Sequence, residues 1–363
     1  MNIGIVTGSR AEWGLLYPLA KAVWMSSDKL NLFVTGSHLS NAHGHTVDEI
    51  RLPITAEIQC VLASDDEKSI CKNVSLAVAG FGDVFDDCTL DCVILLGDRY
   101  EILAAAISAH IHRIPIVHIH GGEVTAGAYD DAFRHSITKM SSLHFVANGE
   151  YRRRVIQLGE RPETVFNVGA LGVTGLSPRN KQPNSKQAIV LYHPETLMAN
   201  STITVYYIVE ALIECGVIPI FILSNADNGN NAINSAIKSF PYNVYTSRER
   251  DEFIDMLLGA DFIIGNSSCG IIEAPALGVP TINVGSRQGG RERASSIIDV
   301  FDPTKQDIIE AINRVYSTSF QNKLSNISMP YENSDNADIS ILSVIRSELE
   351  NVNLLKGFYD LAS

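Results

Sequence analysis

Short, almost uninterrupted runs of apolar residues recur along the chain, and helical spacing follows most of them. In the first half the runs cover 2–8, 31–36, 91–97, 114–122 and 144–149. Continuous apolar runs of this kind are typical of parallel strands covered on both faces. The segments between them predict helices over 12–26, about 67–85, 100–112 and 131–142. This alternation predicts a doubly wound α/β domain with right-handed crossovers.

The same alternation restarts after 176–186, a segment with two prolines and two asparagines that we interpret as a linker. The later apolar runs cover 188–194, 217–225, 242–247, 261–268 and 279–285. We therefore predict two Rossmann-like domains facing a cleft, over 1–175 and 187–340. The end of the chain, 341–363, is predicted to form a helix that packs back on the first domain. Open parallel sheets bind ligands beyond the carboxyl ends of their strands, so we look for chemistry there.

Composition narrows the class of protein. With 363 residues, 45% hydrophobic and 19% charged, the chain can bury a substantial core. Its 41 acidic and 28 basic residues give a formal charge of −13, which argues against a nucleic-acid partner but leaves room for a local basic pocket. No apolar run of about 18 residues is present, so no membrane span is predicted. The first residues lack the layout of a signal peptide, and we expect a soluble, cytoplasmic protein with reduced cysteines.

The segment 7–14, TGSRAEWG, follows the first predicted strand and opens the first predicted helix. Gly8 permits a tight turn, Ser9 is a candidate helix cap, and free backbone N–H groups at a helix start suit an anion. Arg10 would add a charge-assisted contact to a phosphate. A plain strand–turn–helix connection with an exposed arginine explains the same residues equally well.

Three acidic residues are expected near the carboxyl ends of strands. Asp98 directly follows the third apolar run, Glu123 follows the fourth, and Asp131 lies in the first turn of a predicted helix. Asp98 could instead cap a helix, and Asp131 could simply compensate the helix dipole. We expect the three to converge on one side of the predicted cleft, where they raise one another's pKa, which suits general acid–base catalysis near neutral pH.

His118 and His120 precede Glu123 with the spacing that places alternate residues on one face of a strand. A metal site has to be considered, but zinc needs three or four ligands and this motif offers two. We therefore predict no metal, and favour a Gly-Gly turn that brings the backbone close to a ligand.

The second half carries a phosphate-binding pattern. A strand is expected to end near residue 266, and Ser267, Ser268 and Gly270 would open a helix whose N–H groups could cradle a diphosphate. Glu273 lies in the first turn of that helix. The two serines could also act only as caps.

Further candidate residues flank this pattern. His193 ends the first strand of the second half, where a histidine is more often structural than functional. Arg287, Arg291 and Arg293 cluster around a Gly-Gly turn, which is unusual in so acidic a chain. A solvated loop is the alternative interpretation of these arginines.

Taken together, these motifs resemble the hydrolysing UDP-N-acetylglucosamine 2-epimerases, over nearly the whole chain and in the same order. The stretches that carry the resemblance are TGSRAEWG (7–14), GDRYE (97–101), HIHGGE (118–123), DDAFRHSITK (130–139) and GNSSCGIIEAPALGVPTINVGSRQGGRER (265–293). The resemblance implies a two-domain, glycosyltransferase-B-like fold that binds UDP mainly through its second domain. It also implies a homodimer or tetramer and no redox cofactor.

The reaction that the resemblance implies converts a UDP-sugar and water to UDP and the free 2-epimerised acetamido sugar. A carboxylate removes the C2 proton, UDP leaves from C1, and water adds at C1 of a glycal-like intermediate while C2 is reprotonated on the other face. By resemblance, Asp98, Glu123 and Asp131 are the catalytic acids. Asp131 stands where we expect a glutamate in non-hydrolysing relatives, which favours the hydrolysing branch.

The remaining roles implied by resemblance concern UDP. Its phosphates would be held by Arg10, His193, Ser267, Ser268 and Gly270. Glu273 would bind the ribose hydroxyls, and Arg287 and Arg291 would border the same pocket. The substrate is expected to be UDP-N-acetylglucosamine, with UDP-N,N′-diacetylbacillosamine as the alternative. A glycosyltransferase of the same fold and a silent UDP-sugar-binding protein are the other hypotheses.

Overall fold

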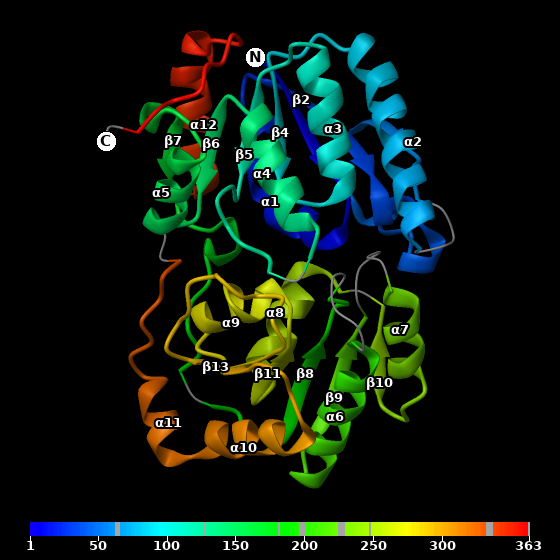
Figure 1. Ribbon diagram of the computed structural model, residues 1–363, viewed down its shortest axis with the longest axis vertical. Coiled ribbons are helices and arrows are strands. Elements are labelled where there is room, and N and C mark those ends of the chain that lie inside the picture. The colour runs from blue at the N-terminus through cyan, green and yellow to red at the C-terminus, as the bar shows by residue number, and fades with distance from the viewer. Residues whose placement is uncertain are drawn as a thin grey trace. The chain divides into compact units, whose positions relative to one another are not determined.

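The structure of the chain is a computed structural model. It describes residues 1–61, 66–126, 128–180, 182–195, 201–223, 229–246, 248–331 and 337–361. The chain divides into two compact units, whose elements are labelled in Figure 1. Unit 1 comprises Met1–Glu123, Asp130–Thr174 and Tyr331–Ser363. Unit 2 comprises Val124–Tyr129 and Gly175–Pro330. The chain thus passes briefly into unit 2 just after Glu123, which the sequence division does not anticipate.

Unit 1 is built on a seven-stranded parallel sheet in the order β3-β2-β1-β4-β5-β6-β7. Its strands are β1 (Asn2–Thr7), β2 (Lys29–Thr35), β3 (Ile54–Ile58), β4 (Cys92–Leu96), β5 (Ile116–Ile119), β6 (Leu143–Val146) and β7 (Val165–Asn167). The prediction of a doubly wound parallel sheet is confirmed. The strand order reverses between β1 and β4, and such a reversal is where open sheets place their ligands.

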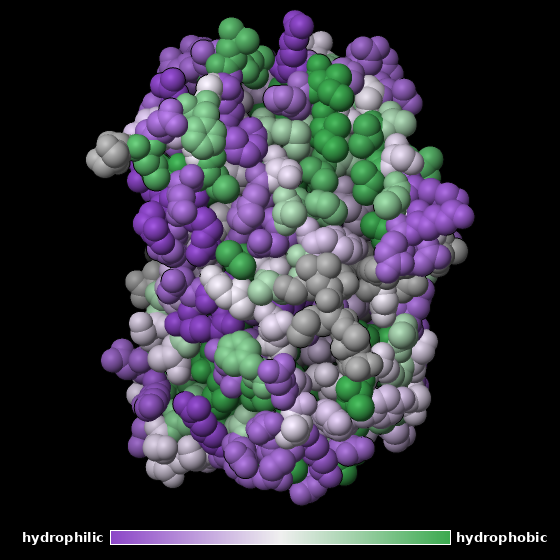
Figure 2. All heavy atoms as spheres, in the orientation of Figure 1, coloured by the Kyte–Doolittle hydropathy of each residue, from purple (hydrophilic) through white to green (hydrophobic). Residues whose placement is uncertain are grey.

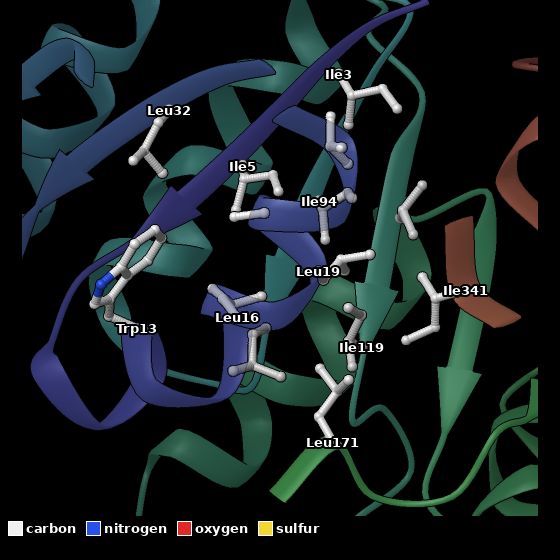
Figure 3. Packing of buried hydrophobic residues seen from close by; sticks show 14 of the residues in the cluster. Ile3, Ile5, Trp13, Leu16, Leu19, Leu32, Ile94, Ile119, Leu171 and Ile341 are labelled. Atoms are coloured by element: carbon white, nitrogen blue, oxygen red, sulfur yellow. The ribbon is translucent and has the colours of Figure 1, made fainter. Parts of the chain in front are cut away.

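Helices cover both faces of this sheet. They are α1 (Arg10–Trp24), α2 (Glu67–Asp86), α3 (Tyr100–Ile111), α4 (Asp130–Met140), α5 (Gly149–Gln157) and α12 (Ala337–Glu348). Figure 3 shows one core, where Ile5 and Ile94 from the strands meet Leu16 and Leu19 of α1, with Ile341 of α12 alongside. Burial of these apolar side chains is the main force that holds the elements together.

Unit 2 repeats the plan with six parallel strands in the order β10-β9-β8-β11-β12-β13. The strands are β8 (Gln187–Leu191), β9 (Ile218–Ile222), β10 (Asn243–Tyr245), β11 (Phe262–Gly265), β12 (Thr281–Val284) and β13 (Ile297–Val300). The helices are α6 (Ser201–Glu214), α7 (Asn230–Lys238), α8 (Arg250–Gly259), α9 (Glu273–Ala276), α10 (Lys305–Tyr316) and α11 (Thr318–Lys323). Here the order reverses between β8 and β11.

The segment 176–186, interpreted as a linker, is part of unit 2 in its described residues. Arg179 donates to the carbonyl of Ala260 at 2.6 Å and to that of Asp261 at 3.1 Å, just beyond the end of α8. Burial lowers the pKa of Arg179 to about 10, so its charge is retained. The proline- and asparagine-rich segment is therefore irregular in structure, but the hydrogen bonds of Arg179 fix it to unit 2.

The end of the chain differs from the expected single helix. Helix α12 ends at Glu348, and 352–361 has no regular structure. Ile341 and Ile345 of α12 are buried in the unit 1 core. Beyond them, Lys356 donates to three carbonyls at the end of α4. Side-chain hydrogen bonds therefore hold this part of the tail, although it is not helical. Among the described helices, none combines the length and apolarity needed to cross a membrane.

Candidate functional site

The turn after β4 and the segment after β5 meet around one buried guanidinium in unit 1. Arg134 of α4, which is 2% exposed, donates to Asp98 Oδ2 through Nη2. Through Nη1 it donates to the carbonyl of His120 at 2.8 Å, and the same nitrogen lies 4.0 Å from Glu123 Oε2. The structure therefore brings Asp98 and Glu123 together, with a positive charge that limits their mutual repulsion. Arg134 lies within the motif DDAFRH but carried no predicted role.

Glu123 is held from its other side by His120. His120 Nδ1 lies 2.6 Å from Glu123 Oε1, and the backbone N–H of Leu171 donates to His120 Nε2 at 3.4 Å. Because Nε2 accepts, a neutral His120 carries its proton on Nδ1 and donates it to Glu123. Gly122 makes the turn possible: its φ is 77°, and a Cβ there would lie 2.5 Å from the carbonyl oxygen of Tyr151. Glu123 is accordingly 1% exposed and fixed in position.

The expectation that His118 and His120 share one strand face is wrong. β5 ends at Ile119, and His120 has a left-handed backbone with φ of 66°, so the alternation stops before it. His118 Nε2 lies 2.8 Å from the Gly97 carbonyl and its Nδ1 lies 3.1 Å from Thr138 Oγ1. Burial lowers the pKa of His118 to about 3, so it stays neutral and holds the turn before Asp98. The described residues contain no cluster of three or more His, Cys, Asp or Glu suited to a metal.

Asp131 lies differently from the other two predicted acids. Its side chain is 32% exposed, and Oδ2 lies 3.5 Å from Nε2 of His135, one helical turn further along α4. Asp130, the preceding residue, is 9% exposed. Successive residues of a helix are turned by about 100°, so only one of the two can face the interior. In α4 that residue is Asp130.

A further charged group, which the sequence did not single out, lies close to Asp98. It consists of Glu12 in the first turn of α1 and of Arg99 and Glu101 at the start of α3, all at most 9% exposed. Arg99 Nε donates to Glu101 Oε1 at 2.7 Å and lies 3.8 Å from Glu12 Oε1. All three residues lie within the motifs TGSRAEWG and GDRYE. The sequence therefore located them, but only the fold shows that they are buried together.

The start of α1 agrees in part with its prediction. Ser9 caps the helix, since its hydroxyl accepts from the backbone N–H of Glu12 at 3.4 Å. Arg10 forms an ion pair with Glu49, and its side chain is 17% exposed. Its guanidinium is therefore already charge-compensated, and a phosphate would have to compete with or join Glu49.

In unit 2, Asn266 ties together the strand ends that carry the other predicted residues. It accepts from the N–H of His193 at 2.7 Å and donates to the carbonyl of His193 at 2.9 Å. Its own carbonyl accepts from Gln288 Nε2 at 2.7 Å and from Arg287 Nη1 at 3.5 Å. Gly265 allows this close approach: with φ of 145°, a Cβ there would lie 1.9 Å from the carbonyl oxygen of Leu191. The structure thus gathers His193, Arg287 and the buried Gln288 at the β8–β11 reversal.

The helix expected to open at Ser267–Gly270 begins later in the structure, at Glu273. Ser268–Gly270 form a single 3₁₀ turn, and α9 spans only Glu273–Ala276. The helix is ended by Gly278, whose backbone is left-handed with φ of 70°. The N–H of Gly278 donates to the Pro275 carbonyl at 3.0 Å and that of Val279 to the Ala274 carbonyl at 2.9 Å, which is a Schellman motif. Ser267 and Ser268 are half-buried, and Gly270 packs against Thr281, whose hydroxyl donates to the Gly270 carbonyl at 2.6 Å.

Glu273 is the residue of this segment most plainly prepared for a ligand. It is 8% exposed, and its Oε2 is buried without a hydrogen-bond partner among the described residues. A buried carboxylate oxygen without a partner is costly, so a hydroxyl or water is expected to bind there.

The arginine cluster divides in the structure. Glu195 accepts from the N–H groups of Ser286 and Arg287 at 2.6 and 2.8 Å and so fixes the turn after β12. Arg291, 9% exposed, donates to the Val124 carbonyl at 3.1 Å. Arg293 instead pairs with Asp299 at 3.1 Å, and its role is structural. Glu195 carried no predicted role, although its position two residues after His193 could have suggested one.

Comparison with known proteins decides the family. The family model described as UDP-N-acetylglucosamine 2-epimerase matches residues 23–346. The chain belongs to this family. A GDP/UDP-N,N′-diacetylbacillosamine 2-epimerase (hydrolyzing) from Campylobacter jejuni is 37% identical to this chain over 345 residues. The match covers 88% of each of the two chains. The polysialic acid biosynthesis protein P7 of Escherichia coli is 38% identical over 381 residues, covering 98% of this chain and 96% of that protein.

Solved structures agree on the fold of this 2-epimerase family member. The UDP-GlcNAc 2-epimerase from Neisseria meningitidis, bound to UDP-GlcNAc, has a TM-score of 0.78 with this chain at 18% identity. The match covers 96% of this chain and 100% of that one. The two parallel-sheet α/β units are therefore of the glycosyltransferase-B-like type, as predicted.

Proposed function

We propose that this chain is a hydrolysing UDP-sugar 2-epimerase that converts UDP-N-acetylglucosamine and water to UDP and N-acetylmannosamine. The observation that carries the proposal is the pair Asp98 and Glu123, held around Arg134 at adjacent strand ends of a UDP-N-acetylglucosamine 2-epimerase family member. The C2–H of the sugar is a very weak acid. Its removal needs a fixed carboxylate together with stabilisation of the leaving group, which such a site supplies.

The reaction proceeds in two balanced stages. A carboxylate takes the C2 proton, the C2 electron pair forms a double bond to C1, and the C1–O bond breaks so that UDP leaves with that bond's electrons. Water then adds to C1 while a proton is delivered to C2 on the opposite face. We assign the acid–base roles to Asp98 and Glu123, with Asp131 as the third predicted acid. Asp130 is the alternative for that third role, because it is the more buried of the two.

We propose that unit 2 binds the UDP part of the substrate. Arg287 and Arg291 provide positive charge, and His193, Ser267, Ser268 and Gly270 line the β8–β11 strand ends. Glu273 Oε2 is suited to accept from the ribose hydroxyls, because it is buried without a partner in the described residues. Arg10 is proposed as a further phosphate ligand, and the reaction needs no redox cofactor.

The second candidate substrate is UDP-N,N′-diacetylbacillosamine. It is favoured by the Campylobacter jejuni relative that is named for that sugar. The proposed site residues contact UDP, C1 and C2, so they do not discriminate at C4 and C6 of the sugar. A glycosyltransferase of the same fold would retain the UDP site but would need an acceptor.

We also propose that the protein acts as a homodimer or a higher oligomer in the cytoplasm. Helix α3 carries Leu103, Ile107 and Ile111 at intervals of four, and Ile111 is 68% exposed. Figure 2 shows hydrophobic residues gathered over α3 and the neighbouring part of α2. Leu76 of α2 is 46% exposed. An apolar patch of this kind is typical of a protein interface. All six cysteines are free thiols, as is usual in a reducing compartment.

The deciding experiment is incubation with UDP-N-acetylglucosamine in D2O, without an acceptor. We expect release of UDP and of a sugar that carries deuterium at C2, followed by NMR and mass spectrometry. Release of UDP without C2 deuterium would identify a transferase or a simple hydrolase instead. The same assay with UDP-N,N′-diacetylbacillosamine, compared through kcat/KM, decides between the two sugars.

Substitution of the carboxylates tests the roles of the residues. Asp98→Asn and Glu123→Gln should each lower kcat by about 10³-fold or more, while UDP still binds. Asp130→Asn and Asp131→Asn, measured side by side, decide which of the two neighbours is the third acid. Near-normal turnover in both Asp98→Asn and Glu123→Gln would refute the assignment.

A further inference from the structure

Next to the proposed catalytic pair lies the buried group Glu12–Arg99–Glu101, to which no step of the reaction has been assigned. Glu101 is fully buried, with one oxygen on Arg99 and the other, Oε2, without a hydrogen-bond partner among the described residues. Its carboxylate is closed in by backbone: a Cβ on Gly8 or on Gly36 would lie 2.6 or 2.7 Å from Oε1. The carboxylate of Glu101 is therefore tightly enclosed.

Glu12 connects this group to the turn between β1 and α1. Its Oε2 accepts from the N–H of Gly8 at 2.7 Å. The carbonyl of Gly8 in turn accepts from the Ser37 hydroxyl at 3.1 Å and from the N–H of His38 at 3.4 Å. Arg10, two residues after Gly8, is a proposed phosphate ligand. The carboxyl of Glu12 thus helps to set the turn from which Arg10 projects.

The charges in this region do not balance. Glu12 and Glu101 share one guanidinium, that of Arg99, and Asp98 adds a third carboxylate nearby, already bonded to Arg134. An uncompensated buried charge is expensive, and protonation of one carboxyl relieves it. Burial first, and then the charge of Glu101, raises the pKa of Glu12 to about 8, although Arg99 and the Gly8 N–H act against this.

Arg10 is a further positive charge near the Gly8 turn, but it is already paired with Glu49. Burial lowers the pKa of His38 to about 4, so the imidazole beside the Gly8 turn is neutral. Burial and the charge of Glu101 raise the pKa of Cys60, and similar causes raise that of Tyr100, so both stay protonated. The excess negative charge is therefore relieved at Glu12.

We propose that Glu12 is a positioning residue of the reaction, and that it works as an uncharged carboxylic acid. This rests on the proposed function. With its proton, Glu12 holds the Gly8 turn and leaves Arg99 to Glu101, so that Asp98 keeps its geometry. Without its proton, Glu12 competes for Arg99 and adds a negative charge beside Asp98. Turnover is then lost in mildly alkaline solution.

The test is the pH profile of Glu12→Gln, which keeps the shape of the protonated side chain but cannot ionise. In the wild type we expect kcat/KM to fall above about pH 8. Glu12→Gln should retain at least about half of the wild-type kcat/KM at pH 7, and its kcat/KM should stay constant up to about pH 9. The control is Glu57→Gln, which removes an exposed glutamate of β3 and should keep the wild-type profile. An unchanged alkaline fall in Glu12→Gln, or a loss of about 100-fold at pH 7 in a folded variant, overturns the proposal.

A second measurement is independent of turnover. Infrared difference spectra of the unliganded protein should show a carboxylic acid C=O band that disappears as the pH rises through about 8 and that Glu12→Gln lacks. If Glu12→Gln retains this band, the assignment is wrong. If the wild type turns over neither UDP-sugar, the proposed function fails, whereas the infrared titration still decides the state of Glu12.

Discussion

Lys356 joins the end of the chain to the helix that carries Arg134, and its removal is a sharp test of how the tail is held. Its Nζ contacts Glu160 Oε2 at 2.5 Å and donates to the carbonyls of Ser141 at 2.6 Å, Lys139 at 2.9 Å and Thr138 at 3.1 Å. These carbonyls lie at the end of α4, where a positive charge also interacts favourably with the helix dipole.

The size of the effect follows from what remains after the change to methionine. Breaking a buried ion pair usually destabilises by about 3–5 kcal/mol, because one charge is left uncompensated. Glu160 keeps Lys139 at 2.7 Å and His144 at 3.0 Å, so its charge stays compensated. Burial also lowers the pKa of Lys356 to about 8, so desolvation already offsets part of the gain. We therefore expect Lys356→Met to destabilise the attachment of the tail by about 2 kcal/mol.

Hydrogen exchange measures this attachment directly. About 2 kcal/mol corresponds to about thirty-fold faster exchange in the described tail residues 352–361 and in the last turn of α4, if exchange follows local opening. Arg153→Met is the matched control, since it removes an exposed pair with Glu150 in the same unit and should leave exchange in the tail unchanged. Equal protection of the tail in Lys356→Met and the wild type would refute the interpretation.

Two further predictions concern stability. The pKa of Glu160 is lowered to about 2, because hydrogen bonds from His144, Lys139 and Lys356 outweigh the opposing effect of burial. This contribution to stability is present above about pH 4.5 and is lost as the pH falls towards 2, by up to about 3 kcal/mol. In urea denaturation, the free energy of unfolding of Glu160→Gln should therefore fall less steeply with decreasing pH than that of the wild type. An identical acid slope would contradict this. Gly265→Ala should destabilise unit 2 by more than about 3 kcal/mol in thermal denaturation, since its Cβ would overlap the Leu191 carbonyl, whereas Gly259→Ala, with nothing within 4 Å, should be tolerated.

The sequence was sufficient to locate strand ends, because buried parallel strands are long apolar runs with polar residues directly after them. Asp98 after β4, Glu123 after β5 and His193 after β8 were found in this way. The same signal does not tell which of two neighbouring polar residues points inward. Asp130 and Asp131 are the same residue type at adjacent positions, and only the rotation of α4 makes the first buried and the second half-buried.

Local pattern also failed where one residue breaks an element. The helix predicted to open at Ser267–Gly270 starts only at Glu273, and the left-handed backbone of Gly278 ends it after one turn. A strand over 114–122 was expected to place His118 and His120 together, but the left-handed backbone of His120 separates their roles.

The sequence by itself determined the fold class, the family and most of the positions around which chemistry is expected, because these depend on periodicity and on motifs that are local in the chain. Tertiary structure alone decided the pairing of charges. Arg134 pairs with Asp98 from another part of the chain, and Glu12 of α1 shares the guanidinium of Arg99 with Glu101. Both arrangements depend on residues that are far apart in the sequence. Electrostatic energies vary with distance and burial, and neither quantity is written in the order of the residues.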